Sequence, residues 1–341
     1  MKKLNPERKK FLINKSLKEE RRKRKRKNLN IRVGISAIRF HLMQNPQFYE
    51  IDGPENLTLK YEDSNKVLKF IKKIKKYANK GYYIDLKLEN TKIINEGAIA
   101  LLLSVISDLE RRRIFFKGTK PKNNKANDIL ERSGFFKHMN GSISKKNRVS
   151  NNKILTTGKI STHQKTLVPE IHKAMETIWG VKARCPALYG GLGEMVRNSC
   201  DHAFQNANST IWHWGITHLE NDNTCKFSFV DNGSGILKTN NSKGVLRKLS
   251  KYFDDNADIL ETAFRDGIES RTGLSWRGKG LPTIFEMYDD NIITNLVVIT
   301  NDVYLDFDRK ISKKINTSFS GTYYFWRIDK NCNPSYFELK K

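Results

Sequence analysis

The sequence predicts an α/β protein built from two successive α/β units, and three observations indicate this class. The 341 residues are enough for two domains with a sizeable core in each, and 38% of them are hydrophobic. Helical and strand-like apolar patterns alternate from about residue 50 to residue 140. After a polar stretch, a second set of helices and strands covers residues 163–330 and ends on apolar strands.

The net charge of +27 is concentrated near the start of the chain. Residues 1–45 form a basic arm with an unbroken run of cations from Arg21 to Lys27. Such a run repels itself and is solvated, and it can contact the phosphates of nucleic acid. Nucleic acid, an anionic surface and no partner at all stay open as interpretations of this arm.

The cysteines and the apolar runs exclude several other classes. The 4 cysteines show no CxxC spacing, so neither a zinc site nor a disulfide framework is predicted. No apolar run is long enough to span a bilayer, and no signal peptide follows the basic residues. We therefore expect a soluble, cytoplasmic protein without a transmembrane segment.

The first α/β unit, residues 50–140, is predicted from its helix and strand signals. Asp63 or Ser64 is expected to cap a helix that ends near Gly81. Strands are expected over residues 82–88 and 114–117, and further helices over residues 96–109 and 124–132. Residues 141–162 are rich in Ser, Asn and Lys, and they are expected to form a linker.

The second unit is organised around a predicted helix over residues 189–204 that places polar groups on one face. Glu194, Asn198 and Asp201 fall at i, i+4 and i+7, whereas Leu192 and Met195 take the apolar side. A carboxylate, an amide and a carboxylate suit a hydrated divalent cation and a water that needs a base. An ordinary amphipathic helix with an acidic face is the alternative.

A buried strand that ends at Asp231 leads into a glycine-containing turn. Gly233 and Gly235 follow the strand, and Ile236 closes the motif. An aspartate at a strand end can accept a hydrogen bond from an exocyclic amine, and glycines let backbone approach a flat ligand. The alternative is an ordinary Asp-Gly turn.

A second glycine-containing stretch opens an apolar segment that is predicted to be a helix. It contains Arg277, Gly278, Lys279, Gly280 and Leu281. Free N–H groups at a helix start, together with its positive dipole end, make a cradle for anions. The glycines therefore favour phosphate binding, and the cations can reach the same phosphates.

The remaining elements of the second unit follow in order. A first helix is expected over residues 167–178, and a hairpin turn over residues 220–223 joins two strands. Residues 237–273 are polar and have the character of a mobile lid. The expected closing strands are 296–300, 303–307 and 322–328, and residues 331–341 are expected to form a tail.

Together, these motifs resemble a known superfamily. Their order, ExxxNxxD, then DxGxGI, then GxG at a helix start, resembles that of the N, G1 and G2 boxes of the GHKL superfamily. This superfamily comprises gyrase B, heat-shock chaperone ATPases, histidine kinases and MutL. Gly321 and Thr322 before an aromatic strand resemble the last box of that family. The resemblance covers about residues 165–329, and it implies a Bergerat-type α/β sandwich with helices on one face of a mixed sheet.

The same resemblance implies ATP and Mg²⁺ as ligands and gives each residue a role. Glu194 would be the catalytic residue that orients or deprotonates the nucleophile, and Asn198 would hold the metal. Asp231 would receive the adenine amine with help from Thr322. The other implied ATP-binding residues are Asp201, Gly233, Gly235, Ile236, Arg277, Gly278, Lys279, Gly280 and Leu281.

Residues 50–140 resemble a different family, the STAS domains of anti-sigma factor antagonists. The segment LKLENTKIINEGAIALLLSVI is similar to the strand, turn and helix around the family's phosphoacceptor site. The resemblance implies a smaller STAS-like α/β domain that binds a protein partner. Here the acceptor position is occupied by Glu96 or Asn95 instead of serine, which puts a switchable hydroxyl in doubt.

The implied activity is ATP hydrolysis with Mg²⁺ that drives a conformational or partner-binding switch. A serine/threonine protein kinase of the anti-sigma-factor type, acting on a partner protein, is one alternative. A non-catalytic module that uses ATP only as a conformational ligand is another. Whether the chain is an enzyme stays open at this point, as does a homodimer.

Overall fold

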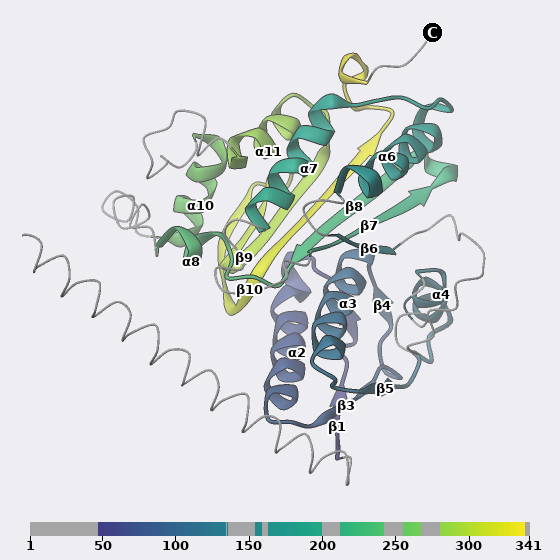
Figure 1. The fold of residues 1–341 in the computed structure, drawn as a ribbon, viewed down its shortest axis with the longest axis vertical. Helices are drawn as coiled ribbons and strands as arrows, with labels where there is room; N and C mark the ends of the chain where they lie inside the picture. Colours follow the sequence, from purple (N-terminus) through teal and green to yellow (C-terminus); the bar gives the residue numbers. More distant parts are fainter. Residues whose placement is uncertain are drawn as a thin grey trace, which may run out of the picture.

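The structure is a computed structural model that describes residues 47–133, 135, 154–158, 163–199, 212–241, 255–266 and 280–337. It is a mixed α/β protein in which a five-stranded sheet lies between two helical layers (Figure 1). Helices α2 and α3 lie below this sheet in Figure 1, and α6, α7, α10 and α11 lie above it. The basic arm predicted for residues 1–45 lies outside the described residues.

The N-terminal part contains a small parallel sheet and three helices. Its strands have the order β1-β3-β5, and two short strands, β2 and β4, pair parallel beside it. The strands are β1 (Phe48–Asp52), β2 (Asn56–Leu57), β3 (Tyr83–Lys87), β4 (Ile93–Ile94) and β5 (Phe116–Gly118). The helices are α2 (Tyr61–Asn79), α3 (Glu96–Arg111) and α4 (Asn124–Arg132).

The predicted helices and strands of this part are confirmed, whereas the predicted cap of its first helix is wrong. Helix α2 begins at Tyr61, and its N-cap residue Lys60 makes no side-chain cap hydrogen bond. Asp63 instead accepts a hydrogen bond from the Thr58 hydroxyl group at 2.7 Å, inside the first turn. The predicted end is right, because Gly81 has a φ of +95° just after the helix.

The C-terminal part contains the five-stranded sheet, whose strand order is β6-β7-β8-β10-β9. Its strands are β6 (Ile154–Gly158), β7 (Trp212–Leu219), β8 (Thr224–Asp231), β9 (Thr294–Asp306) and β10 (Ile311–Asp329). Its helices are α6 (His163–Trp179), α7 (Pro186–Asn198), α8 (Ile236–Asn241), α10 (Asn256–Arg265) and α11 (Gly280–Asp289). Each described pairing in this sheet is antiparallel, so the expectation of a mixed sheet here is wrong; the parallel pairings lie in the N-terminal part.

Both faces of the five-stranded sheet are buried, and the two faces have different partners. Alternate residues of a strand point to opposite faces, so Phe229 and Tyr324 pack under α6, α7, α10 and α11. Val230 and Tyr323 instead share a core with α2 and α3. At Gly97 of α3 a Cβ atom would overlap the Tyr323 ring, so only glycine permits this approach. The N-terminal helices therefore complete the core of the C-terminal sheet.

The end of the chain differs from the predicted arrangement. Strand β9 is continuous where two strands were predicted, and it passes through Asn301 with a φ of +52°. Residues 331–337, predicted as part of a tail, pack onto the fold: Cys332 is buried, and the rings of Phe337 and Trp179 lie 4.4 Å apart.

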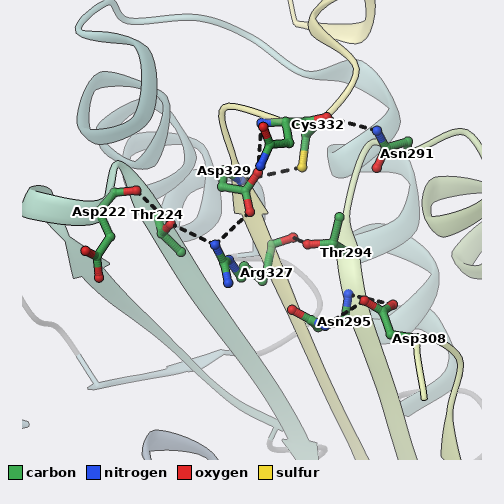
Figure 2. A network of polar contacts seen from close by, with 10 residues as sticks. Asp222, Thr224, Asn291, Thr294, Asn295, Asp308, Arg327, Asp329 and Cys332 are labelled. Carbon is green, nitrogen blue, oxygen red and sulfur yellow. Dashed lines mark hydrogen bonds and ion pairs between the residues drawn. The ribbon is translucent and has the colours of Figure 1, made fainter.

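A polar network closes the end of the sheet at which β8 begins (Figure 2). Arg327 pairs with Asp329 at 2.9 Å and donates to the Thr224 hydroxyl group at 3.4 Å. Cys332 accepts a hydrogen bond from the Asp329 N–H, and the described cysteines are buried and form no disulfide. None of the described helices is long and apolar enough to cross a membrane.

Candidate functional site

Helix α7 positions the two described polar residues of the predicted helical motif. It begins with Pro186 at its first turn, where a missing N–H costs nothing, and buries an apolar face that includes Leu192 and Met195. Glu194 and Asn198 lie one turn apart on the partly exposed side. The helix ends at Asn198, and Asp201, the third residue of the predicted polar face, lies outside the described residues.

Asp231 is the last residue of β8, the middle strand of the sheet, and it contacts Ser199 at the end of α7. Its carboxylate accepts hydrogen bonds from the Gly233 N–H at 2.8 Å and from the Ser199 hydroxyl group at 3.1 Å. Burial raises the pKa of Asp231 to about 6, and the hydrogen bonds from Gly233, Ser199 and Thr322 oppose this shift. A fully buried carboxylate is costly to ionise, and a donor on a bound molecule would stabilise its ionised form.

Thr322 lies beside Asp231, because the two residues are partners in the pairing of β10 with β8. On the other side Thr322 faces Thr300 of β9. The Thr300 hydroxyl group donates to the Gly321 carbonyl oxygen at 2.9 Å and accepts from the Ile236 N–H at 2.9 Å. These bonds tie the end of three strands to the glycine-containing turn.

The turn after Asp231 is held by a side chain that the motif does not contain. Gly235 has a φ of +81°, a backbone conformation that favours glycine. Asn301 accepts hydrogen bonds from the Leu237 N–H at 3.0 Å and the Lys238 N–H at 3.3 Å, and it donates to the Ser234 carbonyl oxygen at 2.9 Å. The Asn301 side chain thus fixes both sides of the turn.

The start of α11 lies against the polar residues of α7. A Cβ atom at Gly280 would lie 2.8 Å from Glu194 Oε2 and 3.5 Å from both Asn198 amide atoms. Leu281 is buried in the core above the sheet. Two motifs separated by some eighty residues therefore meet, while Arg277, Gly278 and Lys279 lie outside the described residues.

Two features of the α7 side chains bear on their chemistry. Glu194 Oε1 pairs with Arg197 at 2.8 Å, and the Glu194 side chain keeps 19% of its surface exposed. Asn198 Nδ2 is buried and has no hydrogen-bond acceptor among the described residues. A buried amide without a partner costs free energy, so an acceptor supplied by a ligand would satisfy it.

Several residues around the site were not predicted from the sequence. Ser199 was not singled out in the sequence, although its position directly after Asn198 was a signal for it. Thr300 and Asn301 follow an apolar run on β9, and this change from apolar to polar residues could have indicated them. No sequence signal indicated Arg197 or Tyr324. The hydroxyl group of Tyr324 is buried without a partner among the described residues, and its strand position lies two residues after Thr322.

The described residues do not form a metal centre by themselves. No group of three or more His, Cys, Asp or Glu in the described ranges could hold a metal ion. A metal beside Asn198 would therefore need further ligands from a bound molecule or from water.

The fold and the site define a mixed α/β protein in which the buried carboxylate of Asp231, the buried amide of Asn198 and the start of α11 lie together at one end of the strands of a sheet. Comparisons with protein-family models, with curated proteins and with solved structures found no match to this chain.

Proposed function

We propose that this chain binds ATP with Mg²⁺ through a GHKL-type site in its C-terminal part and hydrolyses it to drive a conformational or partner-binding switch. The proposed fold of residues 163–330 is a variant of the Bergerat type, and the proposed fold of residues 50–140 is STAS-like. The variant differs in that α2 and α3 cover the second face of the sheet.

The observation that carries the proposal is the convergence of three motifs at one end of the strands of the sheet. Ser199, next to Asn198, donates to Asp231, and Gly280 approaches both Glu194 and Asn198. The sequence resemblance requires these motifs to share one ligand, and an unrelated set of turns has no reason to converge.

The residues present fit a nucleotide at both of its ends. Asp231 can accept from the amine of an adenine when the Thr322 hydroxyl group, which also bonds this carboxylate, turns to the ligand. At the other end, the first N–H groups of α11 suit phosphate oxygens. Asn198 can offer Oδ1 to Mg²⁺, and its unpartnered Nδ2 can donate to a phosphate oxygen.

Glu194 is the proposed base that orients or deprotonates the attacking water. It lies one helical turn before Asn198, so it can face the nucleophile without binding the metal directly. Phosphoryl transfer depends mainly on positioning and charge neutralisation, which these residues supply together. Bound Mg²⁺ would neutralise charge on the phosphates.

One observation favours a second candidate, a module that binds ATP without hydrolysing it. The ion pair between Arg197 and Glu194 Oε1 at 2.8 Å occupies that carboxylate oxygen, so the contact must break before this oxygen can accept a proton from water. The protein kinase alternative, in which the γ-phosphoryl group is transferred to the position equivalent to a STAS phosphoacceptor, has less support. Asn95 caps α3 by accepting from the Ala98 N–H, and Glu96 pairs with Lys226 at the sheet.

Incubation of the purified protein with γ-labelled ATP and Mg²⁺ separates these functions. Released phosphate supports the ATPase, label on protein supports the kinase, and binding alone supports the module. Glu194→Gln should slow phosphate release by about 10²–10⁴, whereas Glu261→Gln should not. Glu261 is a matched control because it pairs with Arg265 on helix α10 but lies outside the site. Absence of any nucleotide binding by the wild-type protein would reject the proposal.

A further inference from the structure

The residue that follows Asp231 leaves the proposed nucleotide site and inserts between two N-terminal helices. Asn232 Oδ1 accepts a hydrogen bond from Lys75 Nζ of α2 at 3.0 Å. Asn232 Nδ2 donates to Ser104 Oγ of α3 at 3.0 Å, and Ser104 Oγ donates to the Leu101 carbonyl oxygen at 2.7 Å. Each donor in this chain has a defined acceptor, so the amide of Asn232 is fixed in one orientation.

The burial of this chain of hydrogen bonds makes its geometry costly to change. Ser104 is fully buried within α3. Burial lowers the pKa of the Lys75 ammonium group, while the carboxylates of Asp108 and Asp231 oppose that shift. Lys75 therefore interacts electrostatically with Asp231 and also donates a hydrogen bond to Asn232. Loss of the Asn232 acceptor would leave the ammonium group of Lys75 without this bond, which costs free energy.

The same helices also support the strand ends from behind. Val230 and Tyr323 precede or follow the site residues by one position, so they point to the opposite face and pack against α2 and α3. At Gly97 of α3, the Tyr323 ring leaves no room for a Cβ atom. A shift of α2 or α3 would therefore move the strand ends that carry Asp231 and Thr322.

We propose that Lys75 and Ser104 are positioning residues of the nucleotide site and that α2 and α3 respond to its occupancy. This inference rests on the proposed function. Lys75 and Ser104 hold Asn232, and Asn232 holds the backbone of Asp231 in the orientation that receives the base. Because coupling between two sites is reciprocal, bound nucleotide also stabilises α2 and α3 in the position that holds Asn232.

The coupling gives the N-terminal part a specific task. None of the proposed nucleotide-binding residues lies on α2 or α3, yet these helices contribute the contacts that fix Asn232. A protein partner that displaced α2 or α3 would weaken nucleotide binding, and bound nucleotide would weaken the binding of that partner to the same extent. The two parts of the chain would act as one switch.

The test measures nucleotide affinity and hydrogen exchange in the full-length protein. Lys75→Met and Asn232→Ala should weaken ATP binding by about tenfold, a typical size for coupling between sites. Lys72→Met is the matched control because Lys72 is exposed on the same helix, and its affinity should be unchanged. Lys75→Arg keeps a donor and a charge, so it should recover part of the loss.

Hydrogen exchange distinguishes positioning from a general loss of stability. In the wild-type protein, ATP with Mg²⁺ should slow exchange at the amides of residues 70–79 and 98–108. Asn232→Ala should remove that nucleotide-dependent protection, whereas Lys72→Met should keep it. A merely structural role would change exchange equally with and without ATP.

The outcomes separate this inference from the proposed function. If the wild-type protein binds ATP but α2 and α3 show no added protection, the inference is wrong and the nucleotide site stands. Unchanged affinity in both Lys75→Met and Asn232→Ala, with folded protein, would also overturn it. If the wild-type protein binds no nucleotide, the proposed function is rejected and the inference with it.

Discussion

Replacement of Asp231 by asparagine should stabilise the protein while it weakens nucleotide binding. The pKa of Asp231 is about 6 in the folded protein, whereas its ordinary value is 3.8. The folded state therefore binds the proton of the Asp231 carboxyl group more tightly than the unfolded state does. The stability that this proton contributes to folding is fully present below pH 3.8. It is lost as the pH rises through about 6. Above that pH, the ionised buried carboxylate costs about 3 kcal/mol, because one pKa unit corresponds to about 1.4 kcal/mol.

The hydrogen bonds of this side chain with Gly233 and Ser199 can survive the change. The new side-chain oxygen can accept from the Gly233 N–H, and the new amide group can donate to Ser199 Oγ. Ser199 then donates only to the Met195 carbonyl oxygen, a bond that it already makes at 2.9 Å. The increase in the free energy of unfolding should approach, at most, about 3 kcal/mol at pH 7.5 and vanish near pH 3.5.

Urea unfolding of the wild-type protein and Asp231→Asn at both pH values measures this difference. Asp266→Asn is the control, because Asp266 is exposed and the change should have little effect. ATP affinity of Asp231→Asn should fall at least about tenfold, since a charged acceptor for the base is replaced by a neutral amide. A variant that unfolds at lower urea than the wild-type protein at pH 7.5 would refute the reasoning.

Four further predictions concern other parts of the chain. Glu194→Gln should lower ATP turnover by about 10²–10⁴ with nucleotide affinity retained, and equal turnover would remove Glu194 as the base. Gly280→Ala should lower ATP affinity, because its Cβ atom would lie 2.8 Å from Glu194 Oε2, and an unchanged dissociation constant would contradict this. Tyr324→Phe should raise the free energy of unfolding by about 1 kcal/mol, because it removes a buried hydroxyl group without a described partner, and a destabilised variant in thermal melts would show otherwise. Deletion of the cations from Arg21 to Lys27 should flatten a log K against log salt slope of roughly −6 for duplex DNA, whereas a salt-independent affinity would exclude phosphate contacts.

Most helices were predictable because their apolar residues keep a helical period over several turns. Helices α8 and α10, by contrast, lie in the stretch that was predicted as a polar lid. Helix α3 has buried residues on every turn, and α4 spans Asn124–Arg132 as predicted. The first half of β10 was missed, because residues 311–321 alternate lysine, serine and threonine with few apolar residues. Pairing with β9, rather than its own composition, makes that segment a strand.

The site was predictable only where a local motif carries the chemistry. Glu194 and Asn198 share a helical face, and Asp231 ends an apolar strand, so spacing alone indicated them. Asn301 and Lys75 were not indicated, because each reaches the turn after Asp231 from a distant part of the chain. Contacts between residues so far apart depend on the packing of layers, which a single sequence does not specify.

The central claim is that Asp231, Asn198 and the start of α11 form one ATP site. Calorimetric titration of the full-length protein with ATP and Mg²⁺ at pH 7.5, repeated with Asp231→Ala, tests it most directly. We expect saturable binding by the wild-type protein and a loss of at least about tenfold in the variant. No binding by the wild-type protein, or equal binding by a folded Asp231→Ala variant, would contradict the claim.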